Sequence, residues 1–261
     1  LTYASIVTKD PKYVELAEEV FFQHTFNPEY CLWYRLEIDG DILPVDDTFN
    51  HQLWFAACAS LLKTPRQNEI KERIILFLNT INNHMQVLDN GLLYHPIKNQ
   101  STGENSKWST LFSIKESMKS LLCILGIRKG QNNHFNDIRI EKTVYKSIGY
   151  HQFNMYAFGI LKEELTDHPF WKSPEFVKSV DYLSSDEFKD GLSSNIYGYP
   201  YNPPGFEVSY ALSVLSDLTE DELIIISSWW INEQLKRSYN PKTQMMDINT
   251  EDPLTHSARI Y

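Results

Sequence analysis

Apolar residues recur along the chain with the three- and four-residue spacing of α-helices. Residues 13–21 and 70–85 each carry one apolar stripe beside polar residues, and each stripe predicts an amphipathic helix that packs on one side. Three other stretches, 53–62, 153–161 and 206–215, are apolar nearly all round. They predict inner helices that neighbouring elements cover on most of their surface.

Signals for helix starts separate the two kinds of helix. An N-cap residue followed by proline or an acidic first turn marks the amphipathic helices, which we expect to begin near Asp10-Pro11, Pro65, Ser173-Pro174 and Thr219-Glu220. The inner helices are expected to begin near Thr48, Ser109, Ile148, Gly205 and Pro253. The alternation of inner and amphipathic helices is typical of stacked helical hairpins. It predicts an all-α fold, an α/α toroid resembling a six-hairpin barrel, with short β-hairpins in its loops.

The connections and the two ends complete this picture of a single domain over residues 1–261. An extended stretch at 32–38 is followed by an Asp-Gly dipeptide, which predicts a hairpin turn. Residues 127–145, with their glycine and asparagines, are interpreted as an irregular connection. The segments 1–7 and 253–261 resemble the end and the beginning of further inner helices. The chain therefore either closes the ring with these segments or lacks an N-terminal hairpin.

Composition excludes several classes of partner. The chain has 24 Lys and Arg against 34 Asp and Glu, a formal net charge of -10, and no basic run that would follow a phosphate backbone, so we expect no nucleic-acid binding. No apolar stretch approaches the length of about 20 residues that crosses a bilayer, and we expect no membrane insertion. Cys31, Cys58 and Cys123 form no CxxC pair and are expected to be reduced, which favours a cytoplasmic protein. The oligomeric state stays open.

The most informative stretch is the helix start at Thr48, where two adjacent acids, Asp46 and Asp47, precede first turns that carry His51 and Trp54. One capping acid is enough to start a helix, so the second acid and the polar, aromatic turn exceed what folding requires. They favour a polar binding mouth with both acids as catalytic candidates. In the alternative interpretation, Asp46 caps the helix, Asp47 favours its dipole, and the other two side chains only pack.

In a toroid, the loops that enter the inner helices meet at one end, so polar residues at several helix starts converge. With His51 and Trp54, the candidate substrate-binding residues are Tyr150, His151, Asn154, Tyr199, Tyr201, His256 and Arg259, and Glu207 is a further candidate acid. Sugars stack on aromatic faces and bind charged or amide groups, so this set favours an oligosaccharide or a small sugar as ligand. No HExxH or comparable spacing predicts a metal site, and we expect no cofactor.

Five short motifs, spread over most of the chain, resemble one enzyme family. The sequence Thr-Lys-Asp-Pro-Lys-Tyr at 8–13 is similar to a TGDxKY step, and Asp-Thr-Phe at 47–49 is similar to the start of a helix that bears a catalytic aspartate. The sequence Asp-Asn-Gly-Leu-Leu-Tyr-His at 89–95 resembles a DxxTGLxYH turn. Residues 149–169 resemble a GWxxxALxxxLxxLPxxHP helix, and 207–211 a Glu-x-Ser segment. In order and spacing the motifs resemble those of the six-hairpin unsaturated glucuronyl and rhamnogalacturonyl hydrolases.

The resemblance implies a reaction and roles for particular residues. An enzyme of this kind hydrates the double bond of an unsaturated uronyl sugar: an acid protonates C4, water adds at C5, and the hemiketal collapses. Asp47 would be the general acid and base, with a pKa raised by burial or by its neighbour Asp46. Glu207 would position the water, and His95 would contact the uronate or its neighbouring sugar. The family's RGNGW stretch is replaced by Lys-Ser-Ile-Gly-Tyr at 146–150, without the arginine fork.

Two other classes of function stay open. An epimerase or isomerase would use two histidines as opposed acid and base, and His151 and His256 are placed on different inner helices. A non-catalytic carbohydrate-binding protein would keep the aromatic pocket without a complete acid pair, and it would tolerate Lys146 in place of arginine. Substitution of Asp47 separates an enzyme from a binding protein, because only an enzyme loses turnover while it keeps its ligand.

Overall fold

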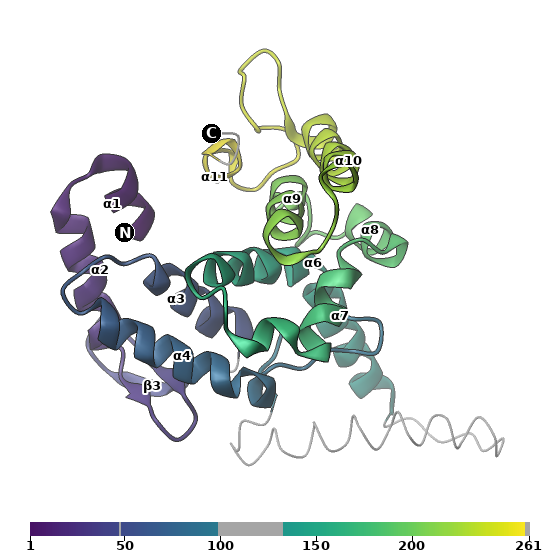
Figure 1. The fold of residues 1–261 in the computed structure, drawn as a ribbon. Coiled ribbons are helices and arrows are strands. Elements are labelled where there is room, and N and C mark those ends of the chain that lie inside the picture. The colour runs from purple at the N-terminus through teal and green to yellow at the C-terminus, as the bar shows by residue number, and fades with distance from the viewer. Residues whose placement is uncertain (47, 99–132, 259–261) are drawn as a thin grey trace.

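Helices make up most of the structure, a computed structural model that describes residues 1–46, 48–98 and 133–258 (Figure 1). The helices are α1 (Thr2–Thr8), α2 (Pro11–Gln23), α3 (Phe49–Ser60), α4 (Gln67–His84), α6 (Asn133–Glu164), η1 (Pro169–Lys172), α7 (Pro174–Tyr182), α8 (Asp186–Ser193), α9 (Pro204–Leu215), α10 (Glu220–Ser238) and α11 (Pro253–Ala258). One small antiparallel sheet accompanies them, with neighbouring strands in the order β1 (Phe26–Asn27), β2 (Leu32–Leu36) and β3 (Ile42–Val45). The prediction of a mostly helical fold with an accessory hairpin is confirmed. The helix expected near Ser109 lies outside the described residues.

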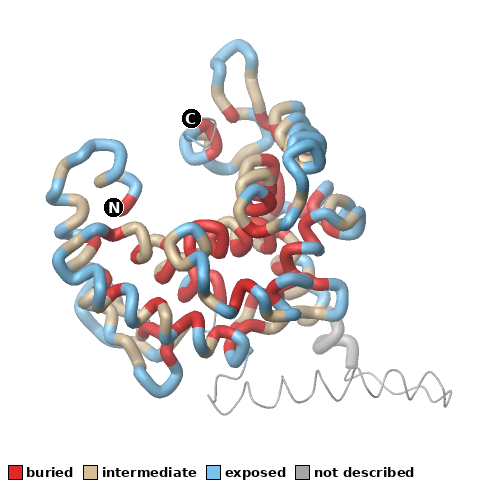
Figure 2. Tube along the Cα trace, viewed as in Figure 1, coloured by how far each residue is buried: buried red, intermediate tan, exposed pale blue. Residues whose placement is uncertain are grey.

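Three helices form the centre of the fold. Helix α6 packs against both α3 and α9, and α9 packs against α10. In Figure 1, α4 lies outside α3 and α10 outside α9, while α1, α3, α6, α9 and α11 follow one another along an arc. Figure 2 shows buried residues concentrated on α3, α6 and α9. These are the predicted inner helices, and Leu53, Phe158 and Val208 are fully buried within them.

Most of the expected helices begin where the sequence predicts, and at α2 and α10 side chains satisfy free backbone amides of the first turn. The Asp10 carboxylate accepts from the Lys12 amide at 3.1 Å at the start of α2. Thr219 and Glu222 form a reciprocal capping box at the start of α10. Pro174 occupies the first position of α7. Capping residues and proline act within a few residues of the helix start, so they can be recognised from the sequence alone.

One prediction of the sequence analysis is wrong: residues 133–145 are not an irregular connection but the first part of α6. The helix continues through Ile148 to Glu164, so the inner helix expected to begin near Ile148 is the second part of a longer helix. Asparagine lowers helix propensity by less than about 1 kcal/mol per residue, and tertiary packing overrides a cost of that size. The remaining residues of that segment, 127–132, lie outside the described part of the chain.

The small sheet holds the start of α3. Strands β2 and β3 are joined by a turn in which Gly40 has a φ of 94°, as the Asp-Gly dipeptide predicts. The Gln52 side chain of α3 binds both backbone groups of Trp33 in β2. Its NH₂ group donates to the Trp33 carbonyl at 2.8 Å, and its carbonyl accepts from the Trp33 amide at 2.9 Å. Both bonds are buried, so they fix the first turns of α3 against the sheet.

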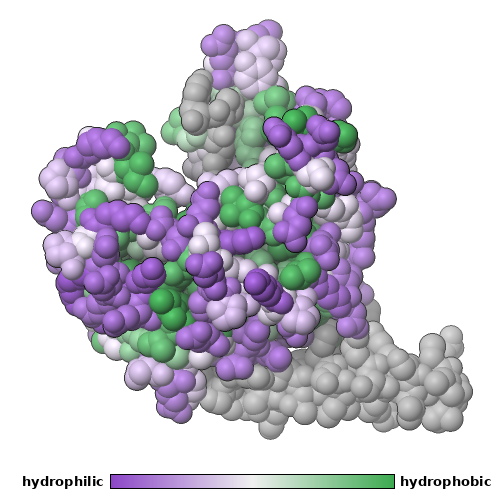
Figure 3. Space-filling model, viewed as in Figure 1, coloured by the Kyte–Doolittle hydropathy of each residue, from purple (hydrophilic) through white to green (hydrophobic). Residues whose placement is uncertain are grey.

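Helix α1 contributes little to the core. Its apolar residues Leu1, Ile6 and Val7 are exposed, although the sequence analysis interpreted this segment as the end of an inner helix. Figure 3 shows apolar side chains over α1, within a viewed face that is otherwise mostly polar. The described core therefore consists mainly of the helices from α2 onward and of the sheet.

A close approach fixes the loop between α8 and α9, which we name the tyrosine loop (residues 194–203), on α6. The side-chain amide of Asn202 donates to the carbonyl of Gly149 at 2.9 Å and to that of Tyr197 at 2.7 Å. A Cβ atom added to Gly149 would collide with the Cβ atom of Tyr197 and would lie 2.8 Å from the side-chain oxygen of Asn195. Glycine at this position therefore lets the loop lie directly on the helix.

We expect the Gly149→Ala substitution to lower the free energy of unfolding by about 1–3 kcal/mol, because the clash outweighs the better helix propensity of alanine. Urea unfolding followed by circular dichroism measures the loss. The Ser228→Ala variant, on the exposed face of α10, is the control and should stay within about 0.5 kcal/mol of the wild type. An equally small effect at Gly149 would contradict the close approach.

Candidate functional site

The start of α3 is organised by Asp46. One carboxylate oxygen accepts from the Thr48 amide at 2.8 Å, and the other lies 2.8 Å from Nδ1 of His51. Burial raises the pKa of this carboxyl, but its hydrogen bonds with His51 and Thr48 outweigh burial, and the pKa lies below the ordinary value. Asp46 is therefore ionised near neutral pH. In the described structure it caps the start of α3 and orients the exposed His51 imidazole, while its role as a catalytic candidate stays a prediction.

The chain around His95 runs beside this helix start. The His95 carbonyl accepts from the Phe49 amide at 3.0 Å. From the other side, α6 provides two acceptors: Oγ of Ser147 accepts from the His95 amide at 3.0 Å, and Nδ1 of His151 accepts from the Leu93 amide at 3.2 Å. Helices α3 and α6 together thus hold the backbone of His95.

The His95 ring is buried but has no hydrogen-bond partner among the described residues. It is 7% exposed, and its ring centroid lies 4.9 Å from that of Tyr150. Burial, followed by the charges of Lys146 and His51, lowers the pKa of His95 to about 4. The imidazole is therefore neutral at physiological pH and offers one N–H donor and one acceptor. Because an unsatisfied buried polar group costs about 1–3 kcal/mol, this ring is suited to a ligand or a water molecule.

Three tyrosines, Tyr150, Tyr197 and Tyr201, lie between His95 and the start of α9. With His51 and His95 they form the surface that we call the mouth. The ring centroid of Tyr150 lies 5.7 Å from that of Tyr197 and 5.9 Å from that of Tyr201. Burial of Tyr150 and its hydrogen bond with Tyr201 raise the pKa of the Tyr150 phenol, which therefore stays protonated. The cluster offers aromatic faces beside hydroxyl groups, the combination on which sugar rings stack and hydrogen-bond.

A depression of about 350 Å³ adjoins His95, and we name it the basic pocket. It is lined by Thr48, His95, Pro96, Lys142, Thr143, Lys146 and Tyr197. The Lys146 ammonium lies 5.5 Å from the centroid of the Tyr150 ring. Lys142 and Lys146 are one helical turn apart on α6, and neither forms an ion pair with an acidic residue of the described part of the chain. This wall is cationic although the whole chain carries a formal charge of -10.

Sequence analysis missed part of this pocket. It did not select Lys142, Thr143 or Tyr197, and it considered Lys146 only as a replacement for an arginine. Two lysines four residues apart on one helix face were the available signal. That signal was lost because residues 127–145 were not expected to be helical.

Three predicted binding residues pack against other parts of the protein. His151 is fully buried, and besides its Nδ1 bond its Nε2 donates to a backbone carbonyl at 2.9 Å. Trp54 stacks on Phe153 with ring centroids 4.4 Å apart and so joins α3 to α6. Tyr199 is buried beside Arg237 of α10, whose guanidinium carbon lies 4.3 Å from its ring centroid. In the described structure these three side chains are thus held by contacts within the protein, and their role in substrate binding stays a prediction.

Three further candidates are buried at or near the inner helix starts. Glu207 is 1% exposed in the first turn of α9. His256 of α11 is fully buried, and its Nε2 donates to the Tyr201 carbonyl at 2.9 Å, which ties α11 to the tyrosine loop. Asn154 of α6 is 1% exposed, and neither atom of its amide group has a partner among the described residues. Of the three, Asn154 has the clearest need for a water molecule or a ligand.

Two predicted site residues, Asp47 and Arg259, lie outside the described residues. Within residues 1–46, 48–98 and 133–258, no cluster of three His, Cys, Asp or Glu side chains could hold a metal ion. Over the same ranges, none of the helices combines the length and the apolar character needed to cross a membrane. Cys31 and Cys58 are free thiols. Cys123 is not among the described residues.

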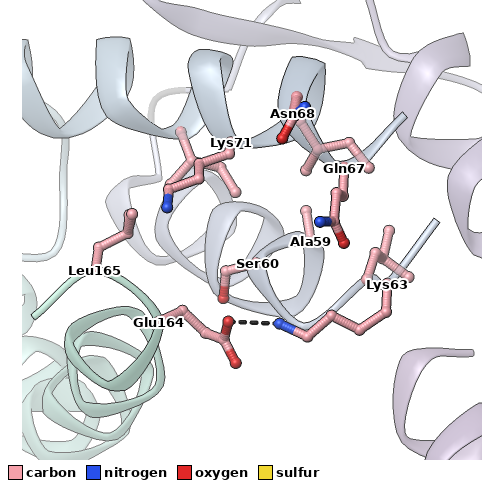
Figure 4. A pocket seen from close by; sticks show the side chains of 11 residues that line it. Ala59, Ser60, Lys63, Gln67, Asn68, Lys71, Glu164 and Leu165 are labelled. Atoms are coloured by element: carbon pink, nitrogen blue, oxygen red, sulfur yellow. Dashed lines mark hydrogen bonds and ion pairs between the residues drawn. The ribbon is translucent and has the colours of Figure 1, made fainter. Parts of the chain in front are cut away.

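A second depression, of about 200 Å³, lies between the carboxyl ends of α3 and α6 and the first turns of α4 (Figure 4). The Lys63 ammonium and the Glu164 carboxylate form an ion pair of 2.6 Å beside it. The charge of Lys63 is therefore neutralised within the protein, unlike the two lysine charges of the basic pocket. This contrast favours the basic pocket as the site for a charged ligand.

The fold and the site together define a mostly helical protein with a polar, aromatic mouth between the start of α3 and the middle of α6, where two lysines form a cationic wall. No family model matches the chain, and no solved structure gives a significant match. The chain is 32% identical over 262 residues to archaeal glycosylation protein Q of Haloferax volcanii. The match covers 100% of this chain and 67% of that protein. The chain belongs to the family of archaeal glycosylation protein Q.

We expect His95 to make the protein less stable in acid. A histidine has a pKa of 6.5 before folding, whereas that of His95 is about 4 in the folded protein, so the unfolded state binds more protons between these values. The stabilising contribution is complete above pH 6.5 and falls as the pH approaches 4, by about 2 kcal/mol at pH 5. Urea unfolding at pH 7 and pH 5 should therefore show a smaller loss for His95→Gln than for the wild type. Equal losses would contradict a neutral, buried His95.

Proposed function

We propose that the protein acts on an oligosaccharide or small sugar in protein glycosylation, and that it hydrates the double bond of an unsaturated uronyl sugar by acid/base catalysis. The observation that carries the proposal is the meeting of His95, Tyr150 and Tyr201 beside the middle of α6, together with His51 at the start of α3, whose charge acts on His95. The printed name of the Haloferax relative, a glycosylation protein, supports a sugar as ligand.

The chemistry of the mouth supports sugar binding. The neutral His95 imidazole and the protonated Tyr150 phenol provide hydrogen-bonding groups for hydroxyls, and the tyrosine rings provide faces for stacking. Tyr150 lies on α6, and the other tyrosines lie on the tyrosine loop, which Asn202 fastens to α6. The backbone of His95, in the segment after α4, is held by Phe49 and Ser147. A ligand would therefore meet a preformed surface, as is usual for small-molecule sites.

Asp47 is the proposed proton donor. It directly follows Asp46, which is ionised, and a negative neighbour raises the pKa of a second carboxyl group. In the proposed reaction Asp47 protonates C4 of the double bond and then accepts a proton from the water that adds at C5. The resulting C5 hemiketal opens to a ketone by breaking the ring C5–O bond, which leaves an acyclic hemiacetal at C1. Collapse of that hemiacetal to an aldehyde breaks the glycosidic C–O bond and releases the alcohol. Glu207, in the first turn of α9, is proposed to position that water.

The arrangement of the helices supports an α/α toroid. Helices α1, α3, α6, α9 and α11 follow an arc, with amphipathic helices outside it (Figure 1). A toroid of this kind gathers the inner helix starts at one end, which accounts for the meeting of residues that lie far apart in the sequence. The proposed active site is that end of the ring.

An epimerase with His151 and His256 as acid and base gains no support from these positions. The rings are fully buried, and each donates from Nε2 to a backbone carbonyl. A non-catalytic carbohydrate-binding protein stays the second candidate, because the mouth is complete as a binding surface without the proton transfer.

We expect Asp47→Asn to lower turnover of 4,5-unsaturated uronyl oligosaccharides by at least about a hundredfold, since an amide cannot exchange the proton. The measurement is the decay of the ultraviolet absorbance of the double bond, with a panel of such substrates. Substrate binding should persist in the variant, because the aromatic and histidine groups remain.

Asp190→Asn, an exposed acid of α8, is the matched control and should keep wild-type turnover. If the absorbance decayed as fast with the Asp47→Asn variant as with the wild type, Asp47 would have no part in the mechanism. Binding of saturated and unsaturated sugars without any decay in the wild type would replace the hydrolase by the carbohydrate-binding protein.

A further inference from the structure

The cationic wall of the basic pocket has no role in the proposed proton transfer. Lys142 and Lys146 stand four residues apart on α6, and two like charges at this spacing destabilise a helix. No described acidic residue neutralises either ammonium group by an ion pair. Elsewhere the protein does pair such charges, as Lys63 and Glu164 show. Among the described residues the two lysines therefore have no counter-charge, and an anionic ligand could supply one.

A second, independent observation lies in the same pocket. His95 lines it, is more than nine-tenths buried, and has no hydrogen-bond partner among the described residues on either ring nitrogen. Its backbone is fixed by Phe49 and Ser147, so the ring is held in place. A neutral imidazole beside two ammonium groups can hydrogen-bond to an oxyanion without adding a third charge.

The size and the aromatic wall of the pocket narrow the class of ligand. A volume of about 350 Å³ is at the lower end of the range for small-molecule sites. Tyr197 contributes a ring to the lining, and Tyr150 lies next to it. Binding of nucleic acid requires an extended row of basic residues, and this pocket has two lysines on a chain of net charge -10. We therefore do not consider nucleic acid as the ligand. The surroundings suit one sugar unit that carries a negative charge.

We propose that the basic pocket binds the anionic group of an acidic sugar, with Lys142 and Lys146 neutralising its charge and His95 hydrogen-bonding to it. The anion is a carboxylate of a uronic acid or a phosphate ester, which share this oxyanion chemistry. The inference of a sugar rests on the proposed function, whereas the binding of the anion requires no turnover. The two ammonium groups, one helical turn apart, would together match the two oxygens of the anion, as a single arginine guanidinium can do.

Calorimetric or NMR titration of the whole chain with glucuronate, glucose 1-phosphate and glucose tests the proposal. We expect at least one acidic sugar to bind at least tenfold more tightly than glucose, and its affinity to fall with added salt. The double variant Lys142→Gln/Lys146→Gln should lose at least tenfold of that affinity and keep its affinity for glucose. Preference for glucuronate or for glucose 1-phosphate identifies the anion as carboxylate or phosphate, and both results support the pocket.

The matched control is Lys178→Gln/Lys242→Gln, which removes two exposed lysines far from the pocket in sequence and should bind as the wild type does. Far-ultraviolet circular dichroism checks that both double variants are folded. The proposal is overturned if glucose binds as tightly as both acidic sugars, if neither acidic sugar binds, or if the pocket variant keeps full affinity. The Asp47→Asn variant should bind acidic sugars normally, so failure of the hydration reaction and failure of the pocket give different results.

Discussion

The buried imidazole of His151 is the interaction on which the site depends. Its Nδ1 accepts from the Leu93 amide, and its Nε2 donates to the Ser179 carbonyl. One side chain of α6 thereby joins the segment before His95 to α7. Burial lowers the pKa of His151 to about 4, so the ring stays neutral, and the Ser179 carbonyl fixes the proton on Nε2. A protonated His151 imidazole could not accept a hydrogen bond from the Leu93 amide. The contact that holds the segment before His95 against α6 would then be lost.

His95 and His151 show how the same residue type takes opposite roles at similar burial. Every ring nitrogen of His151 is used by the backbone, whereas neither ring nitrogen of His95 has a described partner. Protein interiors rarely leave such groups unsatisfied, so the difference in hydrogen bonding separates a structural histidine from one available to a ligand. Burial and lowered pKa alone would not have separated them, because both residues share these properties.

The sequence predicts the parts of this fold that are determined locally. The cap at Asp10, the capping box at Thr219 and the turn at Gly40 each act within a few residues, and all three lie where the sequence places them. The first part of α6 was missed because its helical state depends on packing with distant elements rather than on propensity. His151 was placed in the site because successive residues of a helix point about 100° apart, and the sequence does not fix which direction faces the mouth.

The site itself required the tertiary structure for the same reason. Asp46 and His51 are neighbours in sequence, and the sequence singled them out together. The tyrosine loop reaches α6 only because Gly149 permits close approach and Asn202 fastens it, so Tyr197 could not be associated with Lys146 from the sequence. Convergence of loops is a property of helix register and of small residues at contacts, which periodicity does not encode.

The charges around His95 favour one orientation of an acidic ligand over the reverse. Burial and then the charges of Lys146 and His51 lower the pKa of His95, and the charge of Asp46 raises it, so the ring is within electrostatic reach of both the cationic wall on α6 and the Asp46–His51 pair at the start of α3. An acidic sugar whose anion lay against Lys142 and Lys146, as proposed, would present its other face to the start of α3, which Asp46 organises. The reverse orientation would place the anion beside the ionised Asp46 carboxylate, and the two negative charges would repel each other. In the two proposals, binding of the anion and delivery of the proton are therefore separate tasks, the first of residues on α6 and the second of the sequence just before α3.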